Sequence, residues 1–296
     1  MNGAYRSGMV ALAGRPNVGK STLANALSGV HLAAVSPRPQ TTRRRIAMAV
    51  HGDGWQAVLL DIPGFQTPRD GLTRRMQATV DDTLADCDAA IVMLNAQEAV
   101  GAGDRFIAER VRAAGIPAIV VVNKTDASDP GAIARAIAQG ASLVPDFRAV
   151  HPVSALTGEG LDALRAGLPE VLPEGPAYFP GGLVTDQTPE EVAAELIREA
   201  ALVRLRDEVP HSIAVQIEDI SASRGGGVRV EAVVLVETDS QKGIVVGKGG
   251  AMIREIGTAA RRALTVAWGY ETHLDLFVRV RRRWRDDDGM LDRLGM

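Results

Sequence analysis

Short apolar runs alternate with polar or alanine-rich stretches through residues 1–172. Residues 20–28 and the stretches between the later runs have the spacing of helices. The run at residues 89–95 is apolar up to its final asparagine, which is typical of a strand covered on both faces. The alternation predicts an α/β domain with a mainly parallel sheet and helices on both sides. The predicted strands are residues 10–14, 46–50, 57–61, 89–95, 116–123 and 150–154.

The pattern changes at residues 172–182, where three prolines and three glycines give the composition of a linker. A helix should begin just beyond it. Thr188 is a capping residue, Pro189 stands in the first turn, and Glu191 follows three residues after the cap. The apolar stripe of this helix should contain Val192, Leu196, Ile197, Ala200 and Val203.

The rest of the sequence predicts a second, smaller domain of the α+β class. Residues 213–217 and 228–236 predict two strands, and a glycine run at residues 224–227 should join them as a hairpin turn. A short helix, a glycine-rich loop, a long helix over residues 251–268 and a strand through residues 274–280 follow. The expected bounds are 1–172 for the first domain, 173–188 for a linker and 189–296 for the second domain.

Composition narrows the function classes. The formal net charge is −3 and the pI about 6.0, so any nucleic-acid surface has to be a local patch. The single cysteine, Cys87, predicts a buried free thiol and agrees with a reducing cytosol. Residues 1–10 lack the apolar region of a signal peptide, and no run approaches the roughly 20 apolar residues that span a bilayer. We expect a cytoplasmic monomer; peripheral contact with the inner face of the cell membrane stays open.

The first glycine turn carries the strongest chemical signal. Residues 14–21 are Gly-Arg-Pro-Asn-Val-Gly-Lys-Ser, which fits the phosphate-loop pattern between a strand and a helix. Glycines let backbone N–H groups surround phosphate oxygens, and the start of the following helix favours the same anion. Lys20 is the expected partner of the β- and γ-phosphates, and Ser21 is an expected Mg²⁺ ligand. This loop predicts a nucleoside triphosphate site.

Two later strand ends add a metal-binding signal and a guanine-binding signal to that site. Asp61 begins the segment Asp-Ile-Pro-Gly, so it can hold the Mg²⁺ shell while Gly64 lets the loop reach the γ-phosphate. Asp126, in Asn-Lys-Thr-Asp, can accept two hydrogen bonds from guanine, and adenine lacks both donors in that geometry. Asn123 should anchor this loop, and the Lys124 stem should cover the purine face.

Backbone N–H groups of residues 154–156, at the end of the next strand, could meet the guanine oxygen. The residues expected to contact GTP or GDP are Gly14, Arg15, Pro16, Asn17, Val18, Gly19, Lys20, Ser21, Thr22, Asp61, Gly64, Asn123, Lys124, Asp126, Ser154, Ala155 and Leu156.

These motifs resemble those of the translation-factor-related GTPases and, within them, the Era family. Residues 14–23 and the segment Pro-Gln-Thr-Thr-Arg at residues 39–43 carry the likeness. The resemblance implies that Thr42 lies in the first switch loop and contacts Mg²⁺ and the γ-phosphate, with Thr41 as its rival. The arginines at residues 43–45 are either a basic patch or the solvated end of that loop. The expected metal ligands are Ser21, Thr42 and Asp61.

Phe65 stands where many GTPases carry a glutamine that orients the attacking water. A phenyl ring cannot orient water, so we expect slow intrinsic hydrolysis, raised by a partner or a cation. Gln66 could supply a glutamine side chain instead, but it stands one residue beyond the usual position. Related enzymes use a phosphate-loop asparagine to help bind K⁺, and Asn17 matches that position; its alternative role is to hold the loop in shape. The expected catalytic residues are Lys20, Thr42, Gly64 and Asn17.

A second glycine motif lies in the C-terminal domain. Residues 247–250 are Gly-Lys-Gly-Gly between two predicted helices, which fits the Gly-x-x-Gly clamp of KH domains. Backbone without side chains lets a sugar-phosphate chain pass close to a helix start. Lys248 would add charge, and Ile244 an apolar floor. The expected RNA-binding residues are Ile244, Gly247, Lys248, Gly249, Gly250 and Arg254.

Basic residues gather around this clamp. Residues 248–285 contain nine lysines and arginines and three acidic residues, a balance of about +6 whose attraction for phosphate should weaken with salt. The arginines at 281–283 are either part of this surface or a solvated strand end. Segments at 207–211, 239–243 and 284–288 extend the resemblance to Era over nearly the whole chain. This chain departs from the family pattern at Ile62, where a threonine is usual.

The resemblance implies an α/β P-loop GTPase domain followed by a smaller α+β type II KH domain. It also implies a role in ribosome assembly, with the 3′ end of small-subunit ribosomal RNA and the pre-ribosomal small subunit as partners. A GTPase whose second domain docks protein instead of RNA is the alternative, and crosslinking to RNA separates the two. A tRNA-modifying enzyme is disfavoured, because nothing in residues 189–296 resembles a catalytic constellation.

Overall fold

The computed structural model describes residues 4–38, 41–65, 68–144, 147–223 and 226–296. Pro39, Gln40, Gln66, Arg224 and Gly225, which entered the sequence predictions above, lie outside the described residues. The chain forms two compact units. The first contains Met1–Val30, Thr42–Thr67 and Met76–Asp186, and the second contains His31–Thr41, Pro68–Arg75 and Gln187–Met296.

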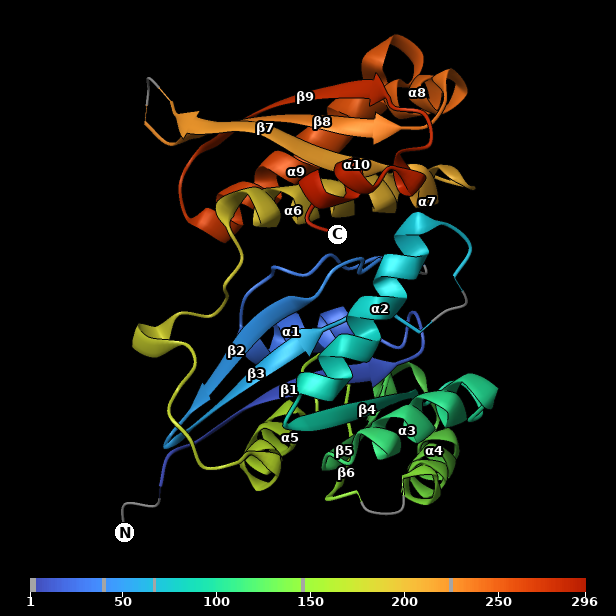
Figure 1. The fold of residues 1–296 in the computed structure, drawn as a ribbon, viewed down its shortest axis with the longest axis vertical. Helices are drawn as coiled ribbons and strands as arrows, with labels where there is room; N and C mark the ends of the chain where they lie inside the picture. The colour runs from blue at the N-terminus through green and yellow to red at the C-terminus, as the bar shows by residue number, and fades with distance from the viewer. Residues whose placement is uncertain (1–3, 39–40, 66–67, 145–146, 224–225) are drawn as a thin grey trace. The chain divides into compact units, whose positions relative to one another are not determined.

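A sheet with the strand order β2-β3-β1-β4-β5-β6 forms the centre of the first unit (Figure 1). Neighbouring strands are parallel except for β2 and β3. Those two are antiparallel because only Asp53 and Gly54 join them, and a parallel pair needs a long crossover. The strands are β1 (Arg6–Gly14), β2 (Ile46–Gly52), β3 (Trp55–Asp61), β4 (Ala89–Asn95), β5 (Ala118–Asn123) and β6 (Val150–Pro152). The predicted, mainly parallel sheet is confirmed.

Helices cover both faces of this sheet, with α1 and α2 on opposite sides of it (Figure 1). All seven residues of β4 are buried, as a strand covered on both faces requires. Cys87 is also buried, and burial raises the pKa of its thiol to about 12, which leaves it protonated and inert. The helices of this sheet are α1 (Lys20–Ser28), α2 (Gly71–Asp86), α3 (Ala102–Ala114), α4 (Pro130–Leu143) and α5 (Leu161–Gly167).

Strand β1 lies where the strand order reverses, since β3 pairs with one of its edges and β4 with the other. The loops that follow β1, β3, β5 and β6 all leave the same end of the sheet. Open parallel sheets bind ligands at such a reversal, outside the carboxyl ends of the strands. The fold therefore brings the four sequence motifs of the first unit to one edge.

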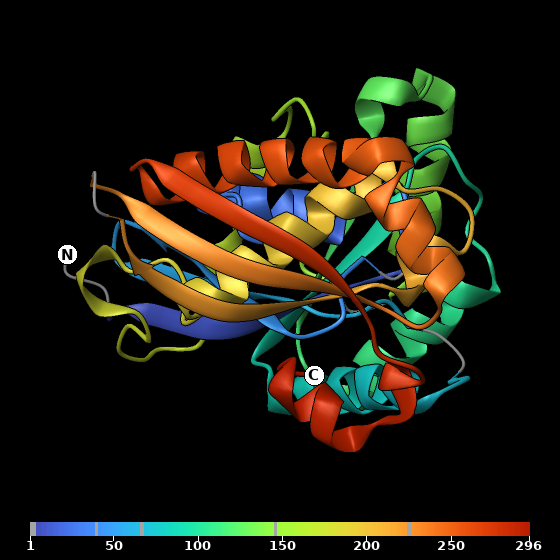
Figure 2. The ribbon, with the colours of Figure 1, turned by 90° about the horizontal axis from the view of Figure 1, so that it is seen from above.

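The second unit contains a sheet with the order β7-β8-β9, in which β8 is antiparallel to β7 and parallel to β9. Helices α6 and α9 pack side by side on one face of this sheet (Figure 2). The predicted order of elements is confirmed, and the structure adds the short helices α7 (Val209–Ser212) and α10 (Asp288–Arg293). The other elements are α6 (Pro189–Arg204), β7 (Ala214–Ala222), β8 (Val228–Val236), α8 (Asp239–Val246), α9 (Ala251–Trp268) and β9 (Thr272–Val280).

The start of α6 follows its sequence signal. The Thr188 side chain accepts a hydrogen bond from the Glu191 N–H, and the Glu191 side chain accepts one from the Thr188 N–H. The predicted apolar stripe is buried except for Val203, which is 57% exposed in the last turn of the helix. Within the described residues, no helix is both long and apolar enough to cross a membrane.

Candidate functional site

The loop between β1 and α1 has two positions that cannot carry a side chain. A Cβ on Gly14 would lie 2.7 Å from Cγ1 of Val18, and a Cβ on Gly19 would lie 2.3 Å from Nδ2 of Asn123. Gly19 also has a φ of 102°, which favours glycine. Asn17 has a φ of 63°, a conformation that asparagine tolerates better than most residues. The glycine spacing of this loop thus reflects close backbone packing.

Lys20, the first residue of α1, is buried. Its ammonium donates hydrogen bonds to the carbonyl oxygens of Gly14 at 3.1 Å and Arg15 at 3.3 Å. Burial lowers the pKa of Lys20, and the nearby Asp61 carboxylate raises it. Neutral carbonyl oxygens compensate a buried cation only in part, so this side chain favours an anion in the loop.

Three side-chain oxygens meet beside this lysine. The Ser21 Oγ lies 2.9 Å from the Thr42 Oγ1 and donates to the Asp61 Oδ2 at 2.6 Å. The Thr42 hydroxyl donates to the same carboxylate oxygen at 3.1 Å. Two hydroxyls and a carboxylate are hard oxygen donors, the kind that Mg²⁺ prefers, so this set fits that ion. Thr41 lies elsewhere, because its hydroxyl donates to the Arg38 carbonyl oxygen at 2.7 Å.

The Asn123 side chain connects three loops. Its Nδ2 donates to the Val18 carbonyl oxygen at 2.8 Å, and its Oδ1 accepts from the Ala155 N–H at 3.0 Å. Asn123 is only 3% exposed, so both bonds are formed in a buried setting where an unpaired amide is costly. The loop of residues 14–21 and the loops after β5 and β6 are therefore held in one arrangement.

Asp126 is held by a side chain to which the sequence assigned only a backbone role. The Ser154 hydroxyl donates to the Asp126 Oδ1 at 2.6 Å and accepts from the Thr157 N–H at 3.1 Å. Ser154 is fully buried, whereas Asp126 is exposed. The hydroxyl thus fixes one carboxylate oxygen and leaves the remaining acceptor capacity to a ligand. The only sequence signal for this contact was the position of residue 154 at a strand end.

Three other predicted residues have specific neighbours. The Arg15 side chain forms ion pairs with Glu98 at 2.5 Å and Asp104 at 2.9 Å, so carboxylates already hold its guanidinium. A Cβ on Gly64 would lie 3.0 Å from Cγ of Pro16, which places the loop after β3 against the phosphate loop. Pro16, Thr22, Lys124 and Leu156 lie on the same loops or in the first turn of α1.

Phe65 packs against the core of the first unit and makes an edge-to-face contact with Phe106, with 5.8 Å between the ring centroids. Its ring thus contributes packing. Arg43 is only 3% exposed, so residues 43–45 do not form the continuous exposed patch or solvated loop end that the sequence suggested. Its burial places it inside the fold with Thr42.

The glycines of the second loop, residues 247–250, differ in the space around them. Gly247, Gly249 and Gly250 have φ values of 72°, 59° and 78°, which favour glycine. A Cβ on Gly247 would lie 2.7 Å from Cβ of Met252, whereas nothing lies within 4 Å of one on Gly249. The Arg254 guanidinium donates to the Gly249 carbonyl oxygen at 2.9 Å and so supports the loop. Lys248 and Ile244 are exposed beside it.

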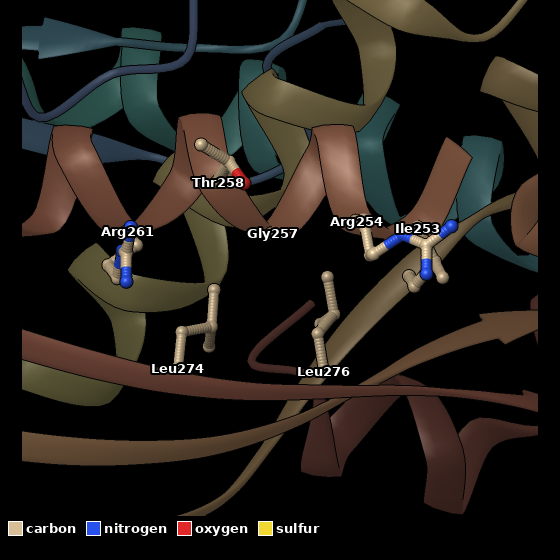
Figure 3. A pocket seen from close by; sticks show the side chains of 7 residues that line it. All are labelled: Ile253, Arg254, Gly257, Thr258, Arg261, Leu274 and Leu276. Carbon is tan, nitrogen blue, oxygen red and sulfur yellow. The ribbon is translucent and has the colours of Figure 1, made fainter. Parts of the chain in front are cut away.

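A pocket of about 250 Å³ lies between α9 and β9, next to this loop (Figure 3). Leu274 and Leu276 point from β9 toward the helix, and arginines stand along its rim. The lining residues are Ile253, Arg254, Gly257, Thr258, Arg261, Leu274 and Leu276. Of these the sequence identified only Arg254. A glycine inside a helix and alternating leucines on the last strand were signals that could have found the others.

The arginines at 281–283 follow the end of β9 and are exposed. Arg281 donates to the Asp287 Oδ2 at 2.7 Å, and this bond is the main reason that the pKa of Asp287 is lowered. Arg281 is therefore held by a carboxylate at a solvated strand end.

Two family models match the chain. Residues 9–124 match the model of 50S ribosome-binding GTPases, and residues 208–285 match that of KH domains. GTPase Era of Mycobacterium avium (strain 104) is 45% identical over 295 residues, which cover 98% of this chain and 99% of the relative. GTPase Era of Mycobacterium tuberculosis (strain ATCC 25618 / H37Rv) is 46% identical over 297 residues with the same coverage.

Solved structures show the same likeness. A crystal structure of Era in complex with MgGDPNP and nucleotides 1506–1542 of 16S ribosomal RNA matches with a TM-score of 0.93 and 33% identity, covering 98% of this chain and 99% of that one. A variant of Aquifex aeolicus Era bound to GDP and AlF4⁻ gives the same values. The match extends over both units, so the nucleotide site and the glycine clamp both fall within it.

Removing the Ser154 hydroxyl should loosen Asp126 and weaken recognition of the guanine 2-amino group. For Ser154→Ala we expect GDP affinity to fall about fivefold to tenfold, which corresponds to the loss of about one ordinary hydrogen bond. Inosine diphosphate lacks the 2-amino group, so the ratio of GDP to IDP affinity, measured by calorimetric titration, should also fall. Thr157→Ala removes a neighbouring hydroxyl that does not contact Asp126 and is the control. Equal losses for both nucleotides would assign Ser154 to loop shape alone.

Proposed function

Because the chain belongs to the Era family of GTPases, we propose that it binds the 3′ end of 16S ribosomal RNA in a GTP-dependent manner during assembly of the small ribosomal subunit. The observation that carries this is the match of both units to an Era that holds MgGDPNP and nucleotides 1506–1542 of that RNA. The chain is a GTPase, with the family's GTPase and KH models in that order. The test is to sequence RNA crosslinked to this protein in its GTP-bound and GDP-bound states.

The proposal includes the domain bounds 1–172, 173–188 and 189–296 and a cytoplasmic monomer. Limited proteolysis should cut first within residues 173–188, and sedimentation of the purified chain should give the mass of one copy. A stable dimer, or cuts inside the two domains before the linker, would overturn these points.

Each group of the first site has a role in this proposal. Asp126, oriented by Ser154, accepts the guanine donors. Lys20 exchanges its two carbonyl partners for β- and γ-phosphate oxygens. The set Ser21, Thr42 and Asp61 would hold Mg²⁺. When bound, this ion would neutralise charge that develops on the phosphates during transfer to water. The backbone N–H groups of the loop bind the same phosphates, so most of the catalysis is positioning and electrostatics.

The roles proposed for the loop at Gly247–Gly250 and the pocket beside it rest on their shape and lining. The loop at Gly247–Gly250 presents bare backbone, and the pocket between α9 and β9 offers apolar walls for bases with arginines at the rim. Such a surface suits a single RNA strand that leaves its bases free to enter the pocket. We place Ile244, Lys248 and Arg254 at the clamp and add Gly257, Leu274 and Leu276 to the groove.

The loops that contain Thr42 and Gly64 are the GTP-sensing loops of this proposal. A segment beside each of them belongs to the second unit, and these segments supply a route by which the nucleotide site is coupled to the KH elements. The first segment, residues 31–41, precedes Thr42. In it the His31 Nε2 lies 2.6 Å from a Glu199 carboxylate oxygen. Arg38 donates a hydrogen bond to the Leu205 carbonyl oxygen at 3.2 Å. Residues 68–75 follow the loop of Gly64. Movement of either GTP-sensing loop therefore pulls on a segment packed with the KH elements.

The segment 68–75 contacts the C-terminal end of the chain. Arg75 pairs with Asp288 at 3.0 Å and Asp292 at 2.5 Å, and the Gly71 N–H donates to the Asp286 Oδ1 at 2.9 Å. Arg285 lies between Asp70, at 3.4 Å, and Glu237, at 2.7 Å. We propose that these contacts transmit the nucleotide state to the RNA-binding elements.

Replacement of Na⁺ by K⁺ should raise GTP hydrolysis at saturating substrate by about tenfold, equivalent to about 1.4 kcal/mol of the barrier. Asn17→Gly keeps the left-handed loop conformation but removes the amide, so it should abolish the difference while GDP affinity is retained. Asn17→Asp keeps an oxygen ligand and should restore part of it. Fast turnover in both salts, or K⁺ stimulation that survives in Asn17→Gly, would refute the K⁺ role.

Gly249→Asp should weaken binding of RNA 1506–1542 at least tenfold, or about 1.4 kcal/mol, because it adds a negative charge where a phosphate passes. The space around the added Cβ is open, and aspartate tolerates a φ of 59°. Gly249→Asn has nearly the same shape without the charge and should lose less than about threefold. Fluorescence anisotropy measures both. Wild-type affinity in both variants would reject the clamp and favour the protein-docking alternative.

Arg75→Ala should reduce the ratio of RNA affinities between the GDPNP-bound and GDP-bound states about fivefold, the lower end of the usual range of coupling energies. The GDP affinity itself should stay within twofold, since Arg75 lies outside the nucleotide site. Arg74→Ala, at an exposed neighbouring position, is the control. An unchanged ratio in Arg75→Ala would show that nucleotide state reaches the KH elements by another route.

A further inference from the structure

Helix α9 lines a second pocket, of about 440 Å³, toward the end of α6. Its lining includes Arg204, Ala251, Arg254, Glu255, Thr258 and Arg262. The residues from α9 recur every three or four positions, which places them along one side of that helix. Three guanidinium groups face one carboxylate, so the pocket carries a local excess of positive charge.

This pocket adjoins the groove between α9 and β9. Arg254 and Thr258 line both of them. Figure 3 shows Thr258 on the side of the helix away from Leu274 and Leu276, so the shared lining passes around α9. A chain that leaves the groove near Arg254 therefore meets the second pocket next.

Two arginines on the sheet of the second unit differ in their pairing from the three that line the second pocket. Arg229, on the sheet, pairs with Asp275 at 2.6 Å, and Arg279 pairs with Glu218 at 3.0 Å. Within the described part of the chain, Arg204, Arg254 and Arg262 form no ion pair: Arg204 and Arg254 donate only to the carbonyl oxygens of Ala200 and Gly249. The charges of the three pocket arginines are thus available to an external anion. The charges of Arg229 and Arg279 on the sheet are largely compensated by their carboxylate partners.

We propose that the α6–α9 arginine surface (Arg204, Arg254 and Arg262) binds phosphates of the RNA chain that adjoins the nucleotides held in the groove. This rests on the proposed function. A Gly-x-x-Gly clamp holds about four nucleotides, whereas the RNA in the solved relative covers nucleotides 1506–1542, so most of that RNA lies beyond the clamp. Guanidinium contacts to phosphates carry little sequence information. The surface therefore adds affinity and salt dependence and leaves sequence choice to the groove.

The test compares two RNA probes by fluorescence anisotropy. One is RNA 1506–1542, and the other is a fragment of about six nucleotides from its 3′ end, long enough for the clamp alone. The double variant Arg204→Gln/Arg262→Gln should bind the long RNA about tenfold more weakly and the short one within twofold of wild type. Loss of two phosphate contacts should also lower the slope of log affinity against log salt for the long RNA by about 1.4.

Two controls isolate the position of the charge. Arg229→Gln/Arg279→Gln removes the same number of charges from the compensated sheet face and should weaken the long RNA less than threefold. Glu255→Gln removes the carboxylate from the pocket and should tighten binding of the long RNA, a change opposite in sign. Far-UV circular dichroism and GDP affinity establish that each variant folds.

Equal weakening of both probes by Arg204→Gln/Arg262→Gln, or weakening no greater than that of the sheet-face variant, would overturn the proposal. No change with either RNA would also overturn it and would leave this surface to an acidic protein segment. Gly249→Asp reports separately on the proposed function, because loss of the clamp should weaken both probes. If Gly249→Asp leaves both probes unaffected, the clamp fails, while the arginine variants still decide whether this surface binds RNA.

Discussion

Two hydrogen bonds of the Asn123 side chain hold the nucleotide site together. A parallel sheet brings the loops after β1, β5 and β6 to one edge, but it does not fix their distances from one another. Asn123 does so by bonding the Val18 carbonyl oxygen on one side and the Ala155 N–H on the other. The amide can approach the phosphate loop this closely only because Gly19 has no Cβ. One buried side chain thus fixes the loops after β1, β5 and β6 relative to one another.

The three side chains that meet at the Asp61 carboxylate come from segments of different kinds. Ser21 is fixed by α1 and Asp61 by β3, whereas Thr42 lies on the segment between α1 and β2. In the described structure the Asp61 carboxylate accepts hydrogen bonds from both hydroxyls. Residues 31–41, which precede Thr42 in the sequence, belong to the second unit, where the His31 Nε2 lies 2.6 Å from a Glu199 carboxylate oxygen.

The sequence predicts the parts of this site that depend on backbone and on strand order. Lys20, Asp61 and Asp126 could be placed because each stands at a strand end or helix start, and parallel strands bring such ends together. The Ser154 hydroxyl, the bond from Arg254 to Gly249 and the burial of Arg43 could not be predicted. They depend on which side chains meet after the elements pack, and no local pattern encodes that. The groove residues Leu274 and Leu276 were predicted only as the apolar face of a strand, since their pocket requires α9 to lie across them.

Charge placement explains how a chain with a formal net charge of −3 can attract RNA. On the sheet of the second unit, Asp275 and Glu218 hold the guanidinium groups of Arg229 and Arg279, so phosphate would have to displace a carboxylate there. On α9 the only carboxylate in the second pocket is Glu255, against three arginines. The uncompensated positive charge of this pocket thus lies along α9, the helix that also lines the groove with β9. Pairing of Arg229 and Arg279 thus removes two competing cations from the sheet face of the same small domain.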